Sequence, residues 1–373
     1  MASQTETFNI NYPSLNPGAA QTVISFIPGT PDLLSIFSPG CDSEQRRCFV
    51  TDATVATLPV MESFISKFED GVCGNDLLII LGSGEPYKTM ESVLEIVSTA
   101  VDAGFSRKDL FIGIGGGVIC DMTGFAASLF KRGAACQFIP TTLLAMVDAS
   151  IGGKTGCDFQ SYKNMIGSFW PAQKIYIFPA FVKYLSNGQY RSGLGEAVKT
   201  GLLYDKELYQ LFKDEAEKIL SRDEELIFEV IKKCATAKAN VVEQDFTEKN
   251  IRMYLNLGHT FGHGLETVAG LGNISHGDAV AWGIGRAVCL SAKEEFCKDS
   301  FKQEVLDVLE KYGWCTEAIP EGVTGGGLGE RLLSAMKKDK KNSSSKIRCV
   351  LLKGMNEPFT QEIDDSKILS VLK

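Results

Sequence analysis

Histidine is scarce in this chain of 373 residues, which contains only three. The sequence also lacks a membrane span, since no apolar run approaches the roughly 18 residues required. Its first residues have no basic segment followed by an apolar one, which predicts a cytoplasmic protein without a signal peptide. The eleven cysteines include no CxxC pair and are odd in number, so we expect reduced thiols rather than a disulfide framework. A basic excess is lacking too: the net charge of -8 argues against general binding to nucleic acid or anionic membrane, so any basic site is local.

Length and hydrophobic patterning predict two domains. A chain of this length exceeds what one hydrophobic core usually supports. Residues 1–187 alternate short apolar runs with amphipathic segments, which is typical of an α/β domain with a parallel sheet. Its predicted strands cover 76–81, 109–114 and 137–139, and its predicted helices cover 87–103 and 118–130. In residues 188–373 apolar residues recur every three or four positions, so we expect an all-α domain. Its predicted helices cover 207–221, 224–242, 259–269, 279–295 and 301–312.

A glycine-rich turn, GIGGGVICDMTG, lies between a predicted strand and helix and includes Gly116 and Gly117. Without Cβ atoms, the backbone can approach a phosphate and present N–H groups to it at the start of the helix. A tight turn without a ligand is the alternative, because the motif is not GxGxxG. Upstream, SGEPYK places Glu85 and Lys88 on a loop at the same edge of the sheet. Glu85 would suit a ribose hydroxyl, although a solvated turn also fits this stretch.

A second cluster joins VDASIGGKTG to SYKNMIG and contains Asp148, Lys154, Lys163 and Asn164. Two lysines and an amide beside paired glycines suggest a phosphate or carboxylate site in an acidic chain, with solvated lysines as the alternative. In SGLGEAVKTG, Glu196 and Lys199 lie three apart on one helix face between apolar neighbours. A surface ion pair would contribute only a few tenths of a kcal/mol there.

All three histidines lie within LNLGHTFGHGLETVAGLGNISHGDAVAWG. His259 and His263 are four residues apart and share a helix face, and His276 follows after a turn. A single histidine on an apolar helix is usually a core residue, but neutral imidazoles with one carboxylate form a catalytic zinc site with an open position. Glu196 is the carboxylate we expect. Spacing alone would make both His259 and His263 ligands.

Taken together, GGGVICDMTGF, KRG, PTTLLAMVDASIGGKTG, KNMIGSF, SGLGEAVK, LNLGHTFGHGLE, SHGDAVAWG and MKKDKK resemble the 3-dehydroquinate synthases of the sugar phosphate cyclase family. The resemblance runs from about Gly82 to about Leu352. It implies an N-terminal dinucleotide-binding domain, a helical C-terminal domain, an active site in the interdomain cleft and a homodimer. It also implies NAD and a divalent metal, usually zinc with cobalt as an alternative. The implied reaction converts 3-deoxy-D-arabino-heptulosonate 7-phosphate to 3-dehydroquinate and phosphate, in the shikimate pathway of aromatic amino acid biosynthesis, by transient oxidation, phosphate elimination, reduction and intramolecular aldol closure.

The resemblance also assigns roles to individual residues. It makes Glu196, His259 and His276 the metal ligands and His263 a phosphate-side group rather than a ligand. Anion binding falls to Lys154, Asn164, Lys199, Asn256, His263 and Lys340, with Arg132 reaching across the dimer interface. Arg252 matches the partner of the substrate carboxylate, and Asp148 and Lys238 match groups that contact substrate hydroxyls. The cofactor set comprises Glu85, Lys88, Gly116, Gly117, Val118, Asp121, Thr141, Thr142 and Lys163. Phe178, Tyr184 and Gln189 depart from the family pattern at positions near the cofactor.

Three alternatives stay open at this point. Another sugar phosphate cyclase, or one acting on an amino-substituted substrate, would keep most of these residues. A metal-dependent polyol dehydrogenase also combines GGG with an HxxxH helix, but it has no use for the phosphate-binding lysines. A regulator that binds NAD or phosphate without catalysis is the third alternative.

Overall fold

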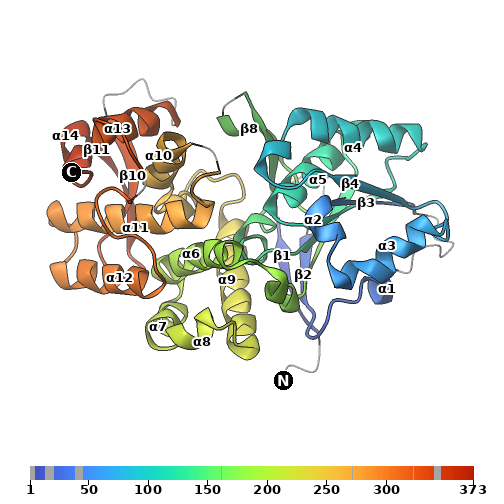
Figure 1. The fold of residues 1–373 in the computed structure, drawn as a ribbon, viewed down its shortest axis with the longest axis horizontal. Coiled ribbons are helices and arrows are strands. Elements are labelled where there is room, and N and C mark those ends of the chain that lie inside the picture. The colour runs from blue at the N-terminus through green and yellow to red at the C-terminus, as the bar shows by residue number, and fades with distance from the viewer. Residues whose placement is uncertain are drawn as a thin grey trace. The chain divides into compact units, whose positions relative to one another are not determined.

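The computed structural model describes residues 5–12, 21–37, 45–160, 162–270, 272–321, 323–339 and 346–373 (Figure 1). Two compact units divide the chain. The first comprises Met1–Ser186 and Lys238–Thr247, and the second comprises Asn187–Ala237 and Glu248–Lys373. This grouping differs from a single break after residue 187 because Lys238–Thr247 returns to the first unit. One contact that joins this segment to the first unit is made by Glu243, which accepts hydrogen bonds from the backbone and side-chain nitrogens of Asn11 at 2.7 and 3.2 Å.

Within the described part of the first unit, seven strands form one sheet in the order β1-β2-β9-β6-β5-β3-β4. Strands β1 and β2 pair antiparallel, and the other neighbours are parallel. The strand bounds are β1 Glu6–Asn11, β2 Gln21–Phe26, β3 Arg47–Asp52, β4 Leu77–Leu81, β5 Leu110–Gly115, β6 Ala135–Pro140 and β9 Lys174–Ile177. A separate hairpin joins β7 Lys154–Phe159 to β8 Tyr162–Phe169.

The middle of this sheet is buried on both faces. All six residues of β5 are buried, which explains why LFIGIG reads as a continuous apolar run. Helices α4 (Met90–Asp102) and α5 (Gly117–Leu129) pack against each other. Helix α3 (Glu62–Glu69) packs Phe64 against Phe49 of β3, with ring centroids 5.0 Å apart. Figure 1 shows α3 and α4 on opposite sides of β3 and β4. The short helices are α1 Leu33–Ile36 and α2 Ala53–Ala56.

The second unit is mainly helical. Its helices are α6 Asn187–Tyr204, α7 Lys206–Asp214, α8 Ala216–Leu220, α9 Glu224–Gln244, α10 His259–Ala269, α11 His276–Lys293, α12 Asp299–Lys311, α13 Leu328–Asp339 and α14 Asp365–Leu369. The last part of α9 belongs to the first unit. Helix α11 is the central element, since it contacts α6, α10 and α12, and Figure 1 shows α11 and α12 side by side. Its buried side chains include Trp282 and Val288.

The predicted strands and helices are observed with small shifts at their ends, apart from one interrupted helix, and several further strands and helices were not predicted. The helix predicted over 207–221 is interrupted at Glu215, where φ is -112° and ψ is 28°, although its apolar spacing continues across the break. The helical character of the second unit is confirmed, but a hairpin of β10 (Lys346–Leu352) and β11 (Pro358–Asp364) was not predicted. Ile347 and Cys349 are buried and Lys346 and Arg348 exposed, so a short alternating pattern was the available signal. Over the described ranges, the structure contains no helix long and apolar enough to cross a membrane.

Candidate active site

Three helices of the second unit carry the predicted metal-site residues. Glu196 lies in the middle of α6, His259 and His263 lie one turn apart on α10, and His276 is the first residue of α11. One ligand atom from each of Glu196, His259 and His276 lies within 4.8 Å of the other two. Oε1 of Glu196 is 3.6 Å from Nε2 of His259 and 3.4 Å from Nε2 of His276. A carboxylate oxygen and two imidazole nitrogens therefore converge, which is a donor set that suits zinc.

Direct backbone contact between α6 and α11 brings Glu196 to His276. A Cβ built on Gly277, the residue after His276, would lie only 1.9 Å from the carbonyl oxygen of Ser192. From the other helix, a Cβ on Gly195 would lie 2.5 Å from the carbonyl oxygen of Gly277. The backbone N–H of Gly277 donates to Oγ of Ser192 at 3.0 Å. Glycines directly beside two predicted ligands therefore set how closely those ligands approach.

Burial and neighbouring charges determine the protonation of the cluster. Glu196 and Lys199 are each 1% exposed and form an ion pair. Burial alone would raise the pKa of Glu196, but attraction to Lys199 and His259 holds it well below its usual range. Burial, assisted by Lys199, holds the pKa of His259 well below its ordinary value. An ionised carboxylate and a neutral imidazole are the forms that bind a metal.

A second carboxylate, Glu266, also contacts His276 and was missed by the sequence analysis. Its Oε1 lies 3.5 Å from Nδ1 of His276, and the residue is only 4% exposed. Burial would lower the pKa of His276, but Glu196 and Glu266 raise it to about 9. The spacing of three residues from His263 on α10 was the available signal. His263, Glu266 and His276 also bring ligand atoms within 4.8 Å of one another, so the geometry offers two three-residue sets that share His276.

In the first unit, the glycine-rich turn joins β5 to α5. Gly116 is the N-cap of α5, provides no side-chain cap, and would place a Cβ 3.1 Å from Cγ2 of Thr142. Gly117 begins the helix and Val118 is its second residue. The backbone N–H of Thr141 donates to the carbonyl of Gly115 at 2.9 Å, which ties β6 to the turn. The helix start is therefore closely packed and presents backbone N–H groups.

Four predicted cofactor residues form charged pairs near this turn. Nζ of Lys88 lies 2.7 Å from Oδ2 of Asp121, and Nζ of Lys163 lies 3.7 Å from Oε1 of Glu85. Burial would lower the pKa of Lys88, but Asp121 and Glu85 raise it above its usual value. Asn164, which was predicted for anion binding, joins this group because its Oδ1 accepts a hydrogen bond from Lys88 at 2.5 Å.

Asp148 and Lys238 also meet within the first unit. Nζ of Lys238 lies 2.7 Å from Oδ1 of Asp148 and donates to its backbone carbonyl at 2.5 Å. Lys238 belongs to the part of α9 that groups with the first unit. The two residues predicted to contact substrate hydroxyls are therefore adjacent.

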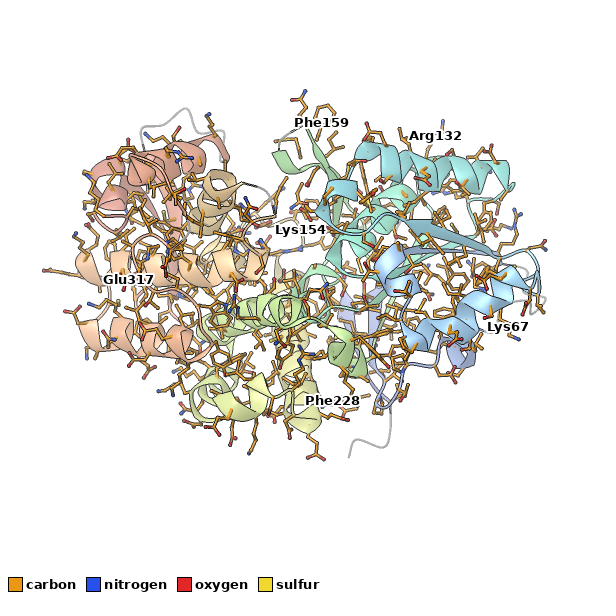
Figure 2. All side chains as sticks on the ribbon, viewed as in Figure 1. Lys67, Arg132, Lys154, Phe159, Phe228 and Glu317 are labelled. Atoms are coloured by element: carbon orange, nitrogen blue, oxygen red, sulfur yellow. The ribbon has the colours of Figure 1, made fainter. Side chains whose placement is uncertain are left out.

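Lys154 and Arg132 are exposed and do not lie together. Lys154 begins β7, and Arg132 lies in a turn where Lys131 and Arg132 both have positive φ, 48° and 66°. Figure 2 shows the two labelled positions well apart. The departure at Phe178 has a packing role, since its ring is buried and contacts Phe181 edge-on at 6.1 Å.

Arg252 and Asn256 lie on a 3₁₀ segment of the second unit, Ile251–Asn256. Arg252 is 1% exposed, and the amide of Asn256 donates to Oε1 of Glu248 at 2.6 Å. This contact of Glu248 was not predicted from the sequence. Lys340 lies outside the described residues.

Family models match most of the chain. The model for the 3-dehydroquinate synthase N-terminal domain matches residues 78–192, and the model for the C-terminal domain matches residues 193–342. The chain belongs to the 3-dehydroquinate synthase family. It is 35% identical over 340 residues to a 3-dehydroquinate synthase of Acidithiobacillus ferrooxidans, covering 91% of each chain. It is 38% identical over 346 residues to the chloroplastic 3-dehydroquinate synthase of Solanum lycopersicum, covering 92% of this chain and 76% of that protein.

Solved structures show the same fold. A 2-deoxy-scyllo-inosose synthase complexed with carbaglucose-6-phosphate, NAD+ and Co2+ matches with a TM-score of 0.83 and 22% identity, covering 98% of this chain and 99% of that chain. The 2-epi-5-epi-valiolone synthase from Streptomyces hygroscopicus subsp. jinggangensis, with NAD+ and Zn2+ bound, matches with a TM-score of 0.81 and 26% identity, covering 94% and 95%. Glycerol dehydrogenase from Schizosaccharomyces pombe is more distant, with a TM-score of 0.63 and 15% identity over 98% of this chain and 91% of that one. The predicted combination of a dinucleotide-binding α/β domain and a helical domain is confirmed.

Proposed function

We propose that this chain converts 3-deoxy-D-arabino-heptulosonate 7-phosphate to 3-dehydroquinate and inorganic phosphate, with bound NAD and a divalent metal. The observation that carries the proposal is the convergence of Glu196, His259 and His276 beside the buried Lys199, in a chain of this family. The reaction proceeds by transient oxidation of the substrate, elimination of phosphate, reduction and intramolecular aldol closure. No net oxidation results.

The residues present fit a divalent metal held by Glu196, His259 and His276. Oε1 of Glu196, which faces both imidazoles, is buried and has no hydrogen-bond partner among the described residues. A buried carboxylate oxygen without a donor is costly unless a cation completes its coordination. When bound there, the metal would polarise a substrate hydroxyl and favour loss of its proton and of hydride from its carbon. Zinc is the metal that we propose, because its usual ligands are imidazole and carboxylate.

The residues of the glycine-rich turn fit NAD. Gly116 and Gly117 have no Cβ, and the backbone N–H groups at the start of α5 would bind a phosphate of NAD. Glu85 would accept a hydrogen bond from a ribose hydroxyl of NAD. NAD, when bound, would accept hydride from the substrate and return it later in the same turnover. The proposed cofactor set is Glu85, Lys88, Gly116, Gly117, Val118, Asp121, Thr141, Thr142 and Lys163.

The chain's basic and amide groups would hold the substrate in place. Lys199 has a buried ammonium beside the proposed metal site. This ammonium would stabilise a phosphate dianion bound there. Arg252 would pair with the substrate carboxylate, and Asp148 and Lys238 would contact its hydroxyls. The proposed phosphate set is Lys154, Asn164, Lys199, Asn256, His263 and Lys340. Holding the leaving phosphate and the ring in a fixed geometry lowers the entropic cost of the elimination.

We also propose a cytoplasmic homodimer in which Arg132 completes the site of the partner subunit. Figure 2 supports this arrangement, because it shows Arg132 apart from Lys154. Lys131 and Arg132 both have positive φ, a strained backbone conformation for residues other than glycine. Such strain is concentrated at functional sites, which supports a functional role for the Arg132 turn. The absence of CxxC pairs among eleven cysteines supports a reducing compartment.

Phosphate release from 3-deoxy-D-arabino-heptulosonate 7-phosphate tests the reaction. We expect release with catalytic NAD, no accumulation of NADH, loss of activity with a chelator and recovery with zinc or cobalt. Net NADH production from a polyol would instead favour the dehydrogenase alternative. Lack of release by protein replete with NAD and metal would reject this substrate and direct the search to other sugar phosphates.

Metal stoichiometry of two matched variants tests the ligand set. His259→Ala and His263→Ala remove imidazoles one turn apart on the same helix. We expect His259→Ala to lose the bound metal and His263→Ala to keep it at one per chain. The opposite pattern would place the metal in the set of His263, Glu266 and His276.

A further inference from the structure

We propose that Glu266 is a positioning residue for the metal site. It accepts the N–H at Nδ1 of His276 and so holds this imidazole in the tautomer whose Nε2 faces Glu196 and His259. The inference rests on the proposed metal-dependent function and adds a residue outside the proposed ligand set.

The two ring nitrogens of His276 have different surroundings. Nε2 lies 3.4 Å from Oε1 of Glu196, and Nδ1 lies 3.5 Å from Oε1 of Glu266. A carboxylate lies beside each nitrogen, so without metal both favour a proton; when a metal replaces the proton on Nε2, the neutral ring keeps its one N–H at Nδ1, where Glu266 accepts it. The lone pair of Nε2 is then available to a metal. Glu266 therefore selects the nitrogen of His276 that binds the metal.

His259 shows the same arrangement with a different acceptor. Its Nε2 lies 3.6 Å from Oε1 of Glu196, and its Nδ1 lies 3.2 Å from the backbone carbonyl of Leu257. Each imidazole therefore presents Nε2 to the same carboxylate oxygen and has an acceptor at Nδ1. Metal-bound histidines usually donate their other N–H to a carboxylate or a carbonyl, which fixes the ring and increases its basicity.

This arrangement also distinguishes between the two three-residue sets that share His276. In the set with Glu196, both histidines would bind through Nε2 and both Nδ1 atoms would have acceptors. In the set with His263 and Glu266, His276 would bind through Nδ1, and its Nε2 would face the buried, orphaned oxygen of Glu196. The first set satisfies more buried groups, so Glu266 serves as an acceptor rather than a ligand.

The burial of Glu266 supports a specific role. It is 4% exposed and lies on α10 next to Leu265, which is 1% exposed. Carboxylates are rarely buried to this extent unless they are paired, because desolvation of the charge is costly. Contact with an N–H that is polarised by a bound metal compensates for part of that cost.

Nitrogen NMR of the wild-type protein tests the tautomer directly. The chain has only three histidines, so selective labelling with ¹⁵N-histidine gives three imidazoles to assign in zinc-loaded protein. We expect His276 and His259 each to carry a proton on Nδ1 and the metal on Nε2. A metal-bound or unprotonated Nδ1 in His276 would overturn the inference, and this measurement does not depend on whether any variant folds.

Substitution of Glu266 tests its effect on metal binding. Glu266→Gln keeps the shape but removes the charge, and Glu266→Ala removes the acceptor. We expect metal affinity, measured by competition with a chelating dye, to fall roughly 10- to 100-fold, with a changed visible absorption spectrum for bound Co²⁺. The loss should be larger for Ala than for Gln.

Asp278→Asn is the matched control, because Asp278 also lies near the start of α11. Its carboxylate accepts hydrogen bonds from Arg191 at 2.8 Å and from Trp314 at 3.0 Å. We expect this variant to keep the wild-type metal affinity and Co²⁺ spectrum. Equal weakening in both variants, or unchanged binding in Glu266→Ala, would overturn the role of Glu266. Absence of metal binding by the wild type would instead reject the proposed function.

Discussion

Gly277→Ala tests the backbone contact that brings the proposed metal ligands together. The added Cβ would lie 1.9 Å from the carbonyl oxygen of Ser192, whereas real Cβ atoms essentially never lie closer than 3.0 Å. The neighbouring atom is backbone and cannot rotate away, so α6 and α11 must separate locally by about 1 Å, the difference between these two distances. The ligands Glu196 and His276 lie on these two helices and would separate with them.

Two measurable losses follow from this separation. Overpacking of this kind costs about 1–3 kcal/mol in free energy of unfolding. Metal–ligand distances tolerate only about 0.2 Å of change, so a shift of this size should distort the site. We expect metal affinity to fall by at least about tenfold, equivalent to about 1.4 kcal/mol.

Gly285→Ala on the same helix is the control. A Cβ there would lie 3.5 Å from the side chains of Leu306 and Leu309, which is ordinary van der Waals contact. We expect it to bind metal as the wild type does and to gain up to about 1 kcal/mol from the better helix propensity of alanine. Denaturant unfolding and chelator competition measure both quantities. If Gly277→Ala matched Gly285→Ala in stability and affinity, the reasoning from the backbone contact would be refuted.

Three further predictions concern the cofactor site, a helix end and the metal. Lys88→Met should weaken NAD binding, measured by calorimetry, by about 10- to 100-fold, because it removes a buried cation paired with Asp121. The metal stoichiometry should not change. Unchanged NAD affinity would contradict the role of Lys88. Asn356→Ala should lower the free energy of unfolding by about 1–3 kcal/mol. Asn356 has a φ of 59°, and its side chain donates to the carbonyls of Gly201 and Leu202 in the last turn of α6. Wild-type stability of the variant would show that these hydrogen bonds are dispensable. At a metal concentration 100 times the dissociation constant, bound metal should raise the free energy of unfolding of the wild type by about 2.7 kcal/mol, and a chelator should remove this gain. Equal melting curves with and without the chelator would argue against a metal site in the folded protein.

The sequence predicted those parts of the fold that depend on local pattern. Strand β5 was recognisable because a strand buried on both faces reads as an unbroken apolar run, and α10 has the bounds that its spacing predicted. The hairpin of β10 and β11 was missed because its alternation covers only a few residues after a lysine-rich segment. The interruption at Glu215 was missed because the apolar spacing continues through it.

The candidate site shows a similar division between local and tertiary information. The spacing of His259 and His263 correctly places both on one face of α10, but it does not say which imidazole meets Glu196. That choice depends on tertiary packing of α11 against both α10 and α6: a Cβ on Gly283 would lie 2.0 Å from the carbonyl oxygen of Gly258, and a Cβ on Gly277 would lie 1.9 Å from that of Ser192. Spacing places Glu266 three residues after His263 on α10, but it does not show that Glu266 meets His276, because that contact exists only after α10 and α11 have packed.

The buried pair of Glu196 and Lys199 is difficult to explain by stability alone. Both side chains are 1% exposed, and desolvation of two charges often exceeds their mutual attraction, so apolar replacements of similar volume are commonly neutral or stabilising. Glu196 moreover directs its second oxygen toward two imidazole nitrogens, 3.6 and 3.4 Å away, without a hydrogen bond of good geometry to either. Such an arrangement leaves one oxygen for a metal cation and one ammonium for an anion beside it. A substrate that binds the metal through a hydroxyl and carries a phosphate nearby would use both charges, which is the chemical reason that the buried pair points to catalysis.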